Sequence, residues 1–280
     1  SVTIDRYQVT VRSLSLAGTL TIISDSRRDE NGVLTISAAS TVDIGGVLIM
    51  DEGLLQGAGA LTIDGTLNFN RGVIDGAGTL TVSSSGIVNL GLGATSSTQP
   101  KIGRRLTNAG SIVIDSLAGL QVTELAALTN LPSGVIELRS GNISFAGIGI
   151  RPTLTNMGIF KRTTTNGMSR ISIPFTNTGS VDVQTGTLAI VGAAFIQTAG
   201  TVLVNGTLAS DQTISVHGGT LKGNGTIEGS VINAGTVSPG HPYGILTIKG
   251  DYTQTSSGIL ASTAAGPIAG VSYGQLKVQQ

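Results

Sequence analysis

A glycine followed by a small residue and then an aliphatic residue recurs along this chain at a fixed long period. The phrase occurs at 46–48, 59–61, 65–67, 72–74 and 78–80, and again at 186–188, 200–202, 206–208, 219–221 and 225–227. Positions of the same phase lie about nineteen to twenty residues apart, and each interval divides into three pieces. Such a period is typical of a solenoid. Three short strands per repeat, each followed by a tight corner, would make one triangular coil of a parallel β-helix.

The segments between the glycines alternate between aliphatic and polar residues. Leu61-Thr62-Ile63 and Leu80-Thr81-Val82 are two examples of this period-two pattern, which predicts half-buried β-strands. In a β-helix the aliphatic set points into the bore and stacks on the equivalent residues of the next coil. The sequence therefore predicts an all-β parallel β-solenoid with about 19–22 residues per coil and three short strands per coil. We expect these leucines in the bore: Leu61, Leu80, Leu188, Leu208 and Leu221.

The composition agrees with this fold. Glycine occurs 41 times, as expected where every coil needs several corners, and proline only 7 times, which suits a backbone committed to ladder hydrogen bonds. No run of eighteen apolar residues occurs, so no transmembrane helix is predicted. Cysteine is absent, which excludes disulfides and cysteine–metal sites.

The repeats predict one continuous solenoid over residues 1–280, because a solenoid grows by adding coils. Residues 1–100 form regular coils, interrupted by a charged insert near 25–30 that we expect to leave one corner as a loop. Residues 101–180 carry a second phrase, Leu-Thr-Asn or Phe-Thr-Asn, at 106–108, 128–130, 154–156 and 175–177. Its wider spacing predicts larger, loop-bearing coils. Residues 181–280 return to the compact repeat.

The recurring asparagines suggest a polar ladder. Stacked at equivalent corners, their side-chain amides would hydrogen-bond from one coil to the next. Asn205 and Asn224, one period apart, are predicted to be two rungs. The other interpretation is a ligand-binding polar stripe, and the ladder is the stronger of the two.

The C-terminal third carries a more specific signature. It contains the segments 218–227 (GGTLKGNGTI), 233–240 (NAGTVSPG), 244–254 (GILTIKGDYTQ) and 273–278 (YGQLKV). Over about residues 186–278 this sequence resembles the passenger domains of bacterial autotransporters. The resemblance implies a secreted, right-handed β-helix displayed on the bacterial surface as an adhesin or scaffold. It brings no catalytic motif to this chain.

An enzymatic alternative rests on carboxylates in the first hundred residues. They are Asp43, Asp51, Glu52, Asp64 and Asp75. Parallel β-helices host polysaccharide lyases and glycoside hydrolases, which use paired acids or Ca²⁺. The simpler interpretation is that these are outward strand or corner residues. We assign no catalytic, cofactor-binding or metal-binding residue, and we expect that the chain is not an enzyme.

Charge is unevenly distributed along the chain. Residues 1–100 hold 5 Lys or Arg and 9 Asp or Glu, residues 101–170 hold 8 and 3, and residues 171–280 hold 3 and 4. The basic middle segment offers candidate contacts to a glycan, a cell-surface ligand or an acidic part of a second copy. These contacts are Lys101, Arg104, Arg105, Arg151, Lys161, Arg162 and Arg170. A net charge of zero and the lack of Trp disfavour both nucleic-acid binding and sugar binding on an aromatic platform.

Together these features predict a non-enzymatic, extracellular structural fibre or adhesin of a bacterial surface. The first and last residues both have strand-like patterns, in Val2-Thr3-Ile4 and Leu276-Lys277-Val278. An uncovered coil is a template for another chain, so we expect head-to-tail association into filaments.

Overall fold

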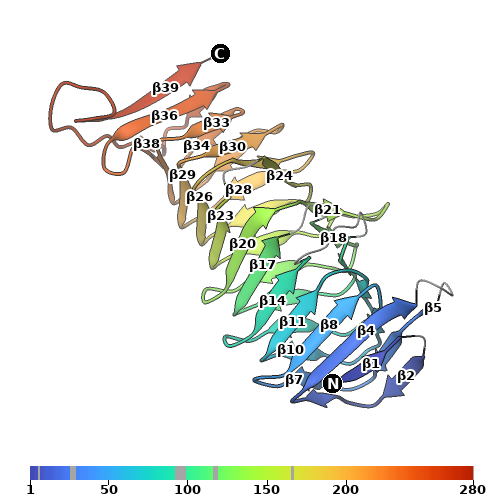
Figure 1. Ribbon diagram of the computed structural model, residues 1–280. Helices are drawn as coiled ribbons and strands as arrows, with labels where there is room; N and C mark the ends of the chain where they lie inside the picture. Colours follow the sequence, from blue (N-terminus) through green and yellow to red (C-terminus); the bar gives the residue numbers. More distant parts are fainter. Residues whose placement is uncertain (6, 26–29, 92–98, 116–118, 165–166, 280) are drawn as a thin grey trace. The chain divides into compact units, whose positions relative to one another are not determined.

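The computed structural model describes all residues except 6, 26–29, 92–98, 116–118, 165–166 and 280. The described chain forms two compact units, Ser1–Pro152 and Thr153–Gln280. Each unit is built from β-strands, and three strands separated by corners make one coil (Figure 1). Among the described residues, no helix is long and apolar enough to span a membrane. The predicted all-β parallel solenoid is confirmed. That the whole chain forms one continuous solenoid stays a prediction.

The first unit contains three parallel sheets, here called A, B and C. Sheet A contains β1 (Val2–Ile4), β4 (Thr19–Asp25), β8 (Val47–Asp51), β11 (Thr66–Phe69), β14 (Ile87–Leu90), β17 (Ser111–Asp115) and β20 (Val135–Ser140). Sheet B contains β2 (Gln8–Val11), β6 (Val33–Ile36), β9 (Leu54–Gln56), β12 (Val73–Ile74), β15 (Lys101–Ile102), β18 (Leu120–Val122) and β21 (Ile143–Phe145). Sheet C contains β3 (Ser15–Leu16), β7 (Ser40–Val42), β10 (Leu61–Ile63), β13 (Leu80–Val82), β16 (Leu106–Asn108) and β19 (Leu128–Asn130).

The second unit also has three parallel sheets, here called D, E and F. Sheet D contains β23 (Ile159–Arg162), β26 (Ser180–Val183), β29 (Thr201–Val204), β32 (Thr220–Gly223), β35 (Thr236–Pro239) and β38 (Ile259–Leu260). Sheet E contains β24 (Met168–Ile171), β27 (Thr187–Ile190), β30 (Thr207–Ser210), β33 (Thr226–Glu228), β36 (Gly244–Lys249) and β39 (Gly274–Gln279). Sheet F contains β22 (Leu154–Asn156), β25 (Phe175–Asn177), β28 (Phe195–Gln197), β31 (Ile214–Val216), β34 (Val231–Asn233) and β37 (Tyr252–Gln254).

The coils differ in length more than the repeat predicts. Thr66 pairs with Val47, nineteen residues earlier, as expected. In contrast, Leu20 pairs with Leu48, which lies twenty-eight residues later. This coil contains the charged insert, which is an arm: β4 pairs antiparallel with β5 (Glu30–Asn31). The tip of the insert, 26–29, lies outside the described residues. In this coil the extra length is thus taken up outside the paired strands, and β4 and β8 stay in register over Thr19–Ile23.

Inward residues fill the bore as the alternation predicts. The predicted inward leucines are all buried, with exposed fractions of 0 or 1%: Leu61, Leu80, Leu188, Leu208 and Leu221. In the second unit aromatic rings also stack between coils. Phe175 makes edge-to-face contacts with Phe160 and Phe195, each with ring centroids 5.1 Å apart. Burial of these side chains is the main stabilising contribution of each coil.

Buried asparagines continue the stack as polar rungs. In the first unit, Asn108 Nδ2 donates to Asn130 Oδ1 at 2.8 Å, and in the second, Asn156 Nδ2 donates to Asn177 Oδ1 at 2.7 Å. The amides also hold nearby corners, because Asn130 Nδ2 donates to the Gly134 carbonyl at 3.1 Å. The predicted ladder therefore exists, at the Leu-Thr-Asn positions.

The prediction that Asn205 and Asn224, outside the Leu-Thr-Asn positions, are rungs of a ladder is wrong. Asn205 and Asn224 are exposed, and no hydrogen bond joins their side chains in the described part of the chain. Each follows an inward residue at the end of its strand, so its own side chain points out of the bore.

Outward positions form columns of hydroxyl groups. On sheet C the register aligns one threonine per strand, half-buried in each case: Thr41, Thr62, Thr81, Thr107 and Thr129. Sheet E has a corresponding column: Thr187, Thr207, Thr226 and Thr247. Adjacent hydroxyls in such a column are separated by about the strand spacing of 4.8 Å.

Candidate functional site: a notch at a shortened corner

The basic residues predicted as contacts fall in both units and differ in exposure. Arg105, Arg151 and Arg170 are exposed, and Lys101 and Lys161 are half-buried. Arg104 and Arg162 are each only 1% exposed. These two guanidinium groups are enclosed, whereas the other five side chains are at least partly exposed. For all seven residues, contact with a partner stays a prediction.

One corner between sheets B and C is two residues shorter than its neighbours. Strand register makes two sets of positions equivalent: Leu55, Ile74, Ile102 and Val122 before the corner, and Leu61, Leu80, Leu106 and Leu128 after it. The intervening segments are 56–60, 75–79, 103–105 and 123–127, so three of these corners have five residues and one has three. The short corner 103–105 leaves a hollow between the wider corners on either side, here called the notch.

The wider corners stack closely because they are rich in glycine. A Cβ on Gly78 would lie 2.1 Å from the backbone oxygen of Gly59 in the preceding coil. Gly76 also has a φ of 106°, which favours glycine. The backbone of corner 75–79 therefore forms a narrow wall of the notch with few side chains.

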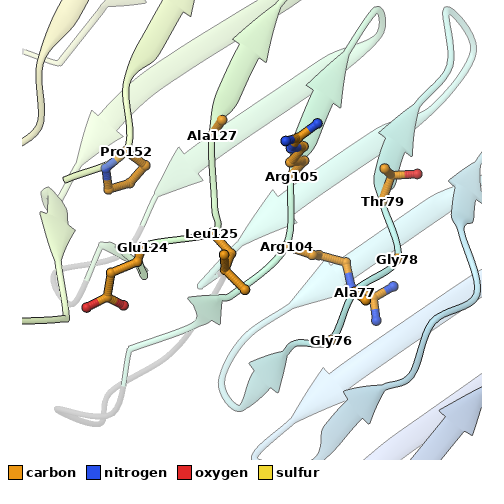
Figure 2. Close-up of a pocket in the computed structure, with 10 residues that line it drawn as sticks. All are labelled: Gly76, Ala77, Gly78, Thr79, Arg104, Arg105, Glu124, Leu125, Ala127 and Pro152. Atoms are coloured by element: carbon orange, nitrogen blue, oxygen red, sulfur yellow. The ribbon is translucent and has the colours of Figure 1, made fainter. Parts of the chain in front are cut away.

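Arg104 forms the floor. Its side chain extends toward corner 75–79 (Figure 2). One Nη donates to the Gly59 carbonyl at 3.2 Å, and the other donates to the carbonyls of Gly57, at 3.3 Å, and Asp75. Arg104 thereby ties its own corner to those of the two preceding coils. Burial lowers the pKa of Arg104, an effect that the charge of Asp75 opposes.

Arg104 carries a positive charge and forms no ion pair with any residue that the structure describes. Its acceptors are neutral carbonyls, and Nε has no hydrogen-bond partner among the described residues. The next residue, Arg105, is exposed and takes part in no ion pair within the described part of the chain. Two adjacent cations without carboxylate partners thus lie at the short corner.

Glu124 lies on the opposite wall, in corner 123–127. Its Oε1 accepts hydrogen bonds from the backbone amides of Ile148, at 3.0 Å, and Gly149, at 3.1 Å. Hydrogen bonds from its own amide and from those two amides lower the pKa of Glu124. The carboxylate is therefore ionised at neutral pH and holds the long corner after β21 in place.

The notch is large enough for a small ligand. Its volume is about 470 Å³, and Figure 2 shows the short corner between the two wider ones. Its lining residues are Gly76, Ala77, Gly78, Thr79, Arg104, Arg105, Glu124, Leu125, Ala127 and Pro152. Leu125 is 67% exposed and supplies an apolar surface. The notch thus combines cations, a carboxylate, a hydroxyl and an apolar face.

Comparisons with known proteins add little beyond this geometry. No family model matches the chain, and no curated protein matches it. Among solved structures it is similar to one described as "Crystal structure of TibC-catalyzed hyper-glycosylated TibA55-350 fragment". The identity is 16% and the TM-score 0.29, over 93% of this chain and 96% of that one. At these values the similarity carries no argument about function.

The carboxylates of the enzymatic alternative lie at three different kinds of corner. Asp43 and Asp64 follow strands of sheet C, Asp51 and Glu52 lie at the end of β8 in sheet A, and Asp75 follows β12 in sheet B. Arg71 neutralises two of them, with Nε 2.7 Å from Asp51 and Nη1 2.5 Å from Glu52. Within the described residues, no cluster of His, Asp or Glu could hold a metal ion. The arrangement gives no support to catalysis by this set.

Sequence reasoning missed most of the notch. It identified Arg104 and Arg105 by charge but not Glu124, Leu125 or Thr79. The available signal was spacing: three residues separate Ile102 from Leu106, where five separate Ile74 from Leu80. That difference becomes meaningful only when the strand register is known.

Proposed function

We propose that this chain is a non-enzymatic structural fibre or adhesin at the surface of a bacterium. The observation that carries the proposal is the repetition of one coil plan in both units. The coils bury aliphatic and amide stacks, and outward threonines of sheets C and E align in columns. A surface of this kind offers many weak, repeated contacts, and the continuous ladders make the backbone difficult for proteases to open.

The C-terminal sequence signature supports an extracellular location. The resemblance to autotransporter passengers covers 186–278, which lies within the second unit. Its Asn-Ala-Gly segment forms a corner where Asn233 Oδ1 accepts the Gly235 amide at 3.1 Å. This asparagine is buried and repeats the rung design of the Leu-Thr-Asn coils.

The location and the activity can be tested together in the bacterium that carries the gene. Antibodies raised against the 280-residue chain should label intact cells, and beads coated with the folded chain should adhere to cell or glycan surfaces better than beads coated with heat-unfolded chain. Labelling only after permeabilisation would overturn the proposed location. Release of sugar products from polysaccharides by the purified chain would favour the enzymatic alternative.

For the 280-residue chain we also propose end-to-end association. In this chain, β1 and β39 pair on one side with β4 and β36, and each is an edge strand of its sheet. Val2 in β1 and Ile259 in β38 are 64% and 56% exposed. Light scattering over a wide concentration range tests this association. The average particle mass should increase with protein concentration, and the increase should be smaller for Val2→Lys. A chain that stays monomeric throughout would contradict it.

A further inference from the structure

We propose that the notch binds one carboxylated sugar unit, a hexuronate, of an anionic polysaccharide. This inference rests on the proposed function as an adhesin and specifies a glycan class for it. The notch lies wholly within the first unit, and the closely stacked corner 75–79 forms one of its walls.

The carboxylate of the sugar would be held by Arg105, the exposed arginine of the short corner. Arg105 presents an exposed guanidinium, a donor fork that suits a carboxylate. The adjacent Arg104 is enclosed, with its guanidinium on backbone carbonyls, and it adds a nearby positive charge without contacting the ligand. Asp75, whose Oδ1 accepts the amide of Gly76 at 2.7 Å, forms no ion pair with Arg104 among the described residues, although its charge favours the protonated form of Arg104. The exposed guanidinium of Arg105 is therefore the contact proposed for the anion.

The opposite wall suits hydroxyl groups. Glu124 uses Oε1 to hold the backbone amides of Ile148 and Gly149, and Oε2 offers additional acceptor lone pairs. This oxygen can accept hydrogen bonds from sugar hydroxyls, and the exposed Thr79 can donate or accept another. The exposed side chain of Leu125 lies where it can contact the apolar C–H face of a sugar ring.

This combination favours an acidic sugar over an acidic peptide. The ionised Glu124 repels the carboxylate of either ligand, but a hexuronate also carries hydroxyl groups that can donate to Glu124, and an acidic side chain carries none. The notch is also bordered by corners and not by a strand edge, so it offers no ladder for an extended peptide. Its volume of about 470 Å³ lies within the usual range of ligand pockets, roughly 300 to 1,000 Å³, and its open side leaves room for the rest of a polysaccharide.

The test is calorimetric titration of the purified 280-residue chain with trigalacturonate. Its neutral counterpart, galactotriose, tests the need for the carboxylate, and a glutamate hexapeptide tests the peptide alternative. The variants are Arg105→Gln and Glu124→Gln, with Arg12→Gln as the matched control. Arg12 is an exposed arginine in the same unit, outside the notch. Thermal melts of each variant establish that it is folded.

We expect trigalacturonate to bind more tightly than the neutral sugar, with affinity falling as salt is added. Arg105→Gln should weaken binding about ten-fold or more, because it removes a charge-assisted contact. Glu124→Gln should weaken it less, and Arg12→Gln should leave it unchanged. Four results would each overturn the proposal. They are equal binding of galactotriose and trigalacturonate, tighter binding of the glutamate peptide, no binding of trigalacturonate, and a loss of affinity in Arg12→Gln as large as that in Arg105→Gln. Cell labelling and bead adhesion would be unaffected by that outcome, so the proposed surface function is judged separately.

Discussion

The substitution Asn130→Asp probes the buried amide ladder with the smallest change in shape. Asn130 is fully buried, and its amide both accepts from Asn108 at 2.8 Å and donates to the Gly134 carbonyl at 3.1 Å. Aspartate keeps the acceptor. In its ionised form, however, it replaces the donor with a second oxygen that faces the carbonyl of Gly134.

The expected loss is large at neutral pH and smaller in acid. An uncompensated buried charge costs about 3 to 5 kcal/mol, so the carboxyl should instead retain a proton, which can donate to Gly134. Its pKa in the folded variant should then lie above the unfolded value of about 3.9. A raised pKa means that the folded state binds more protons, so stability falls as pH rises from about 4 until it passes the folded pKa. Every ten-fold increase in the proton affinity of the folded state lowers the free energy of unfolding at neutral pH by about 1.4 kcal/mol more.

Urea unfolding at several pH values between acid and neutral, followed by far-UV circular dichroism, measures the effect. Asn205→Asp is the matched control, because Asn205 is exposed and an aspartate there should change stability little at any pH. If Asn130→Asp lost no more stability than the control at neutral pH, or became more stable relative to the parent as pH rose, the ladder would not stabilise the coil as argued.

Three further predictions concern the bore, the corners and the notch. Leu208→Asp places a charge at a position that is 0% exposed, and it should lower the stability by several kcal/mol or prevent folding. The control Thr207→Asp should have a melting temperature close to that of the parent. Equal melting temperatures for the two variants would refute the inward assignment of Leu208. Gly78→Val brings a Cβ to 2.1 Å from the Gly59 carbonyl and should destabilise the chain by about 1 to 3 kcal/mol or more, and an unchanged melting temperature would contradict the close stacking of these corners. Glu124 should titrate below the ordinary range of glutamate, because amides hold its ionised form; carboxyl ¹³C shifts measure this, and a normal or raised midpoint would show that the long corner is not held by this carboxylate.

Much of the fold could be predicted because the same residue pattern recurs in each coil of a solenoid. The alternation around Leu61 and Leu80 predicts which side chains enter the bore, and both are buried. The sequence also predicts an amide ladder, but it places a rung at Asn205 on the strength of the period. Period alone does not distinguish an inward position from the residue after it. Whether a side chain points inward depends on its position within the strand, and a shift of one residue moves it to the other face.

The candidate site was less accessible from sequence. Arg104 and Arg105 are adjacent and have the same charge, yet one is buried and the other exposed. Their difference arises from the length of one corner relative to its neighbours in other coils. Glu124 follows some twenty residues later in the chain and reaches the notch only through the register of β18 with β15. Local sequence contains no signal of either contact.

The shortened corner also indicates how surfaces of this kind can change over evolutionary time. Side chains in the bore keep the strands aligned, so inserting or deleting residues at one corner leaves the neighbouring coils in place, as the coil of twenty-eight residues demonstrates. A loss of two residues at 103–105 is sufficient to open a hollow and bring an arginine to its rim. In this solenoid, small insertions and deletions at a corner can create a new recognition surface with little effect on the rest of the molecule.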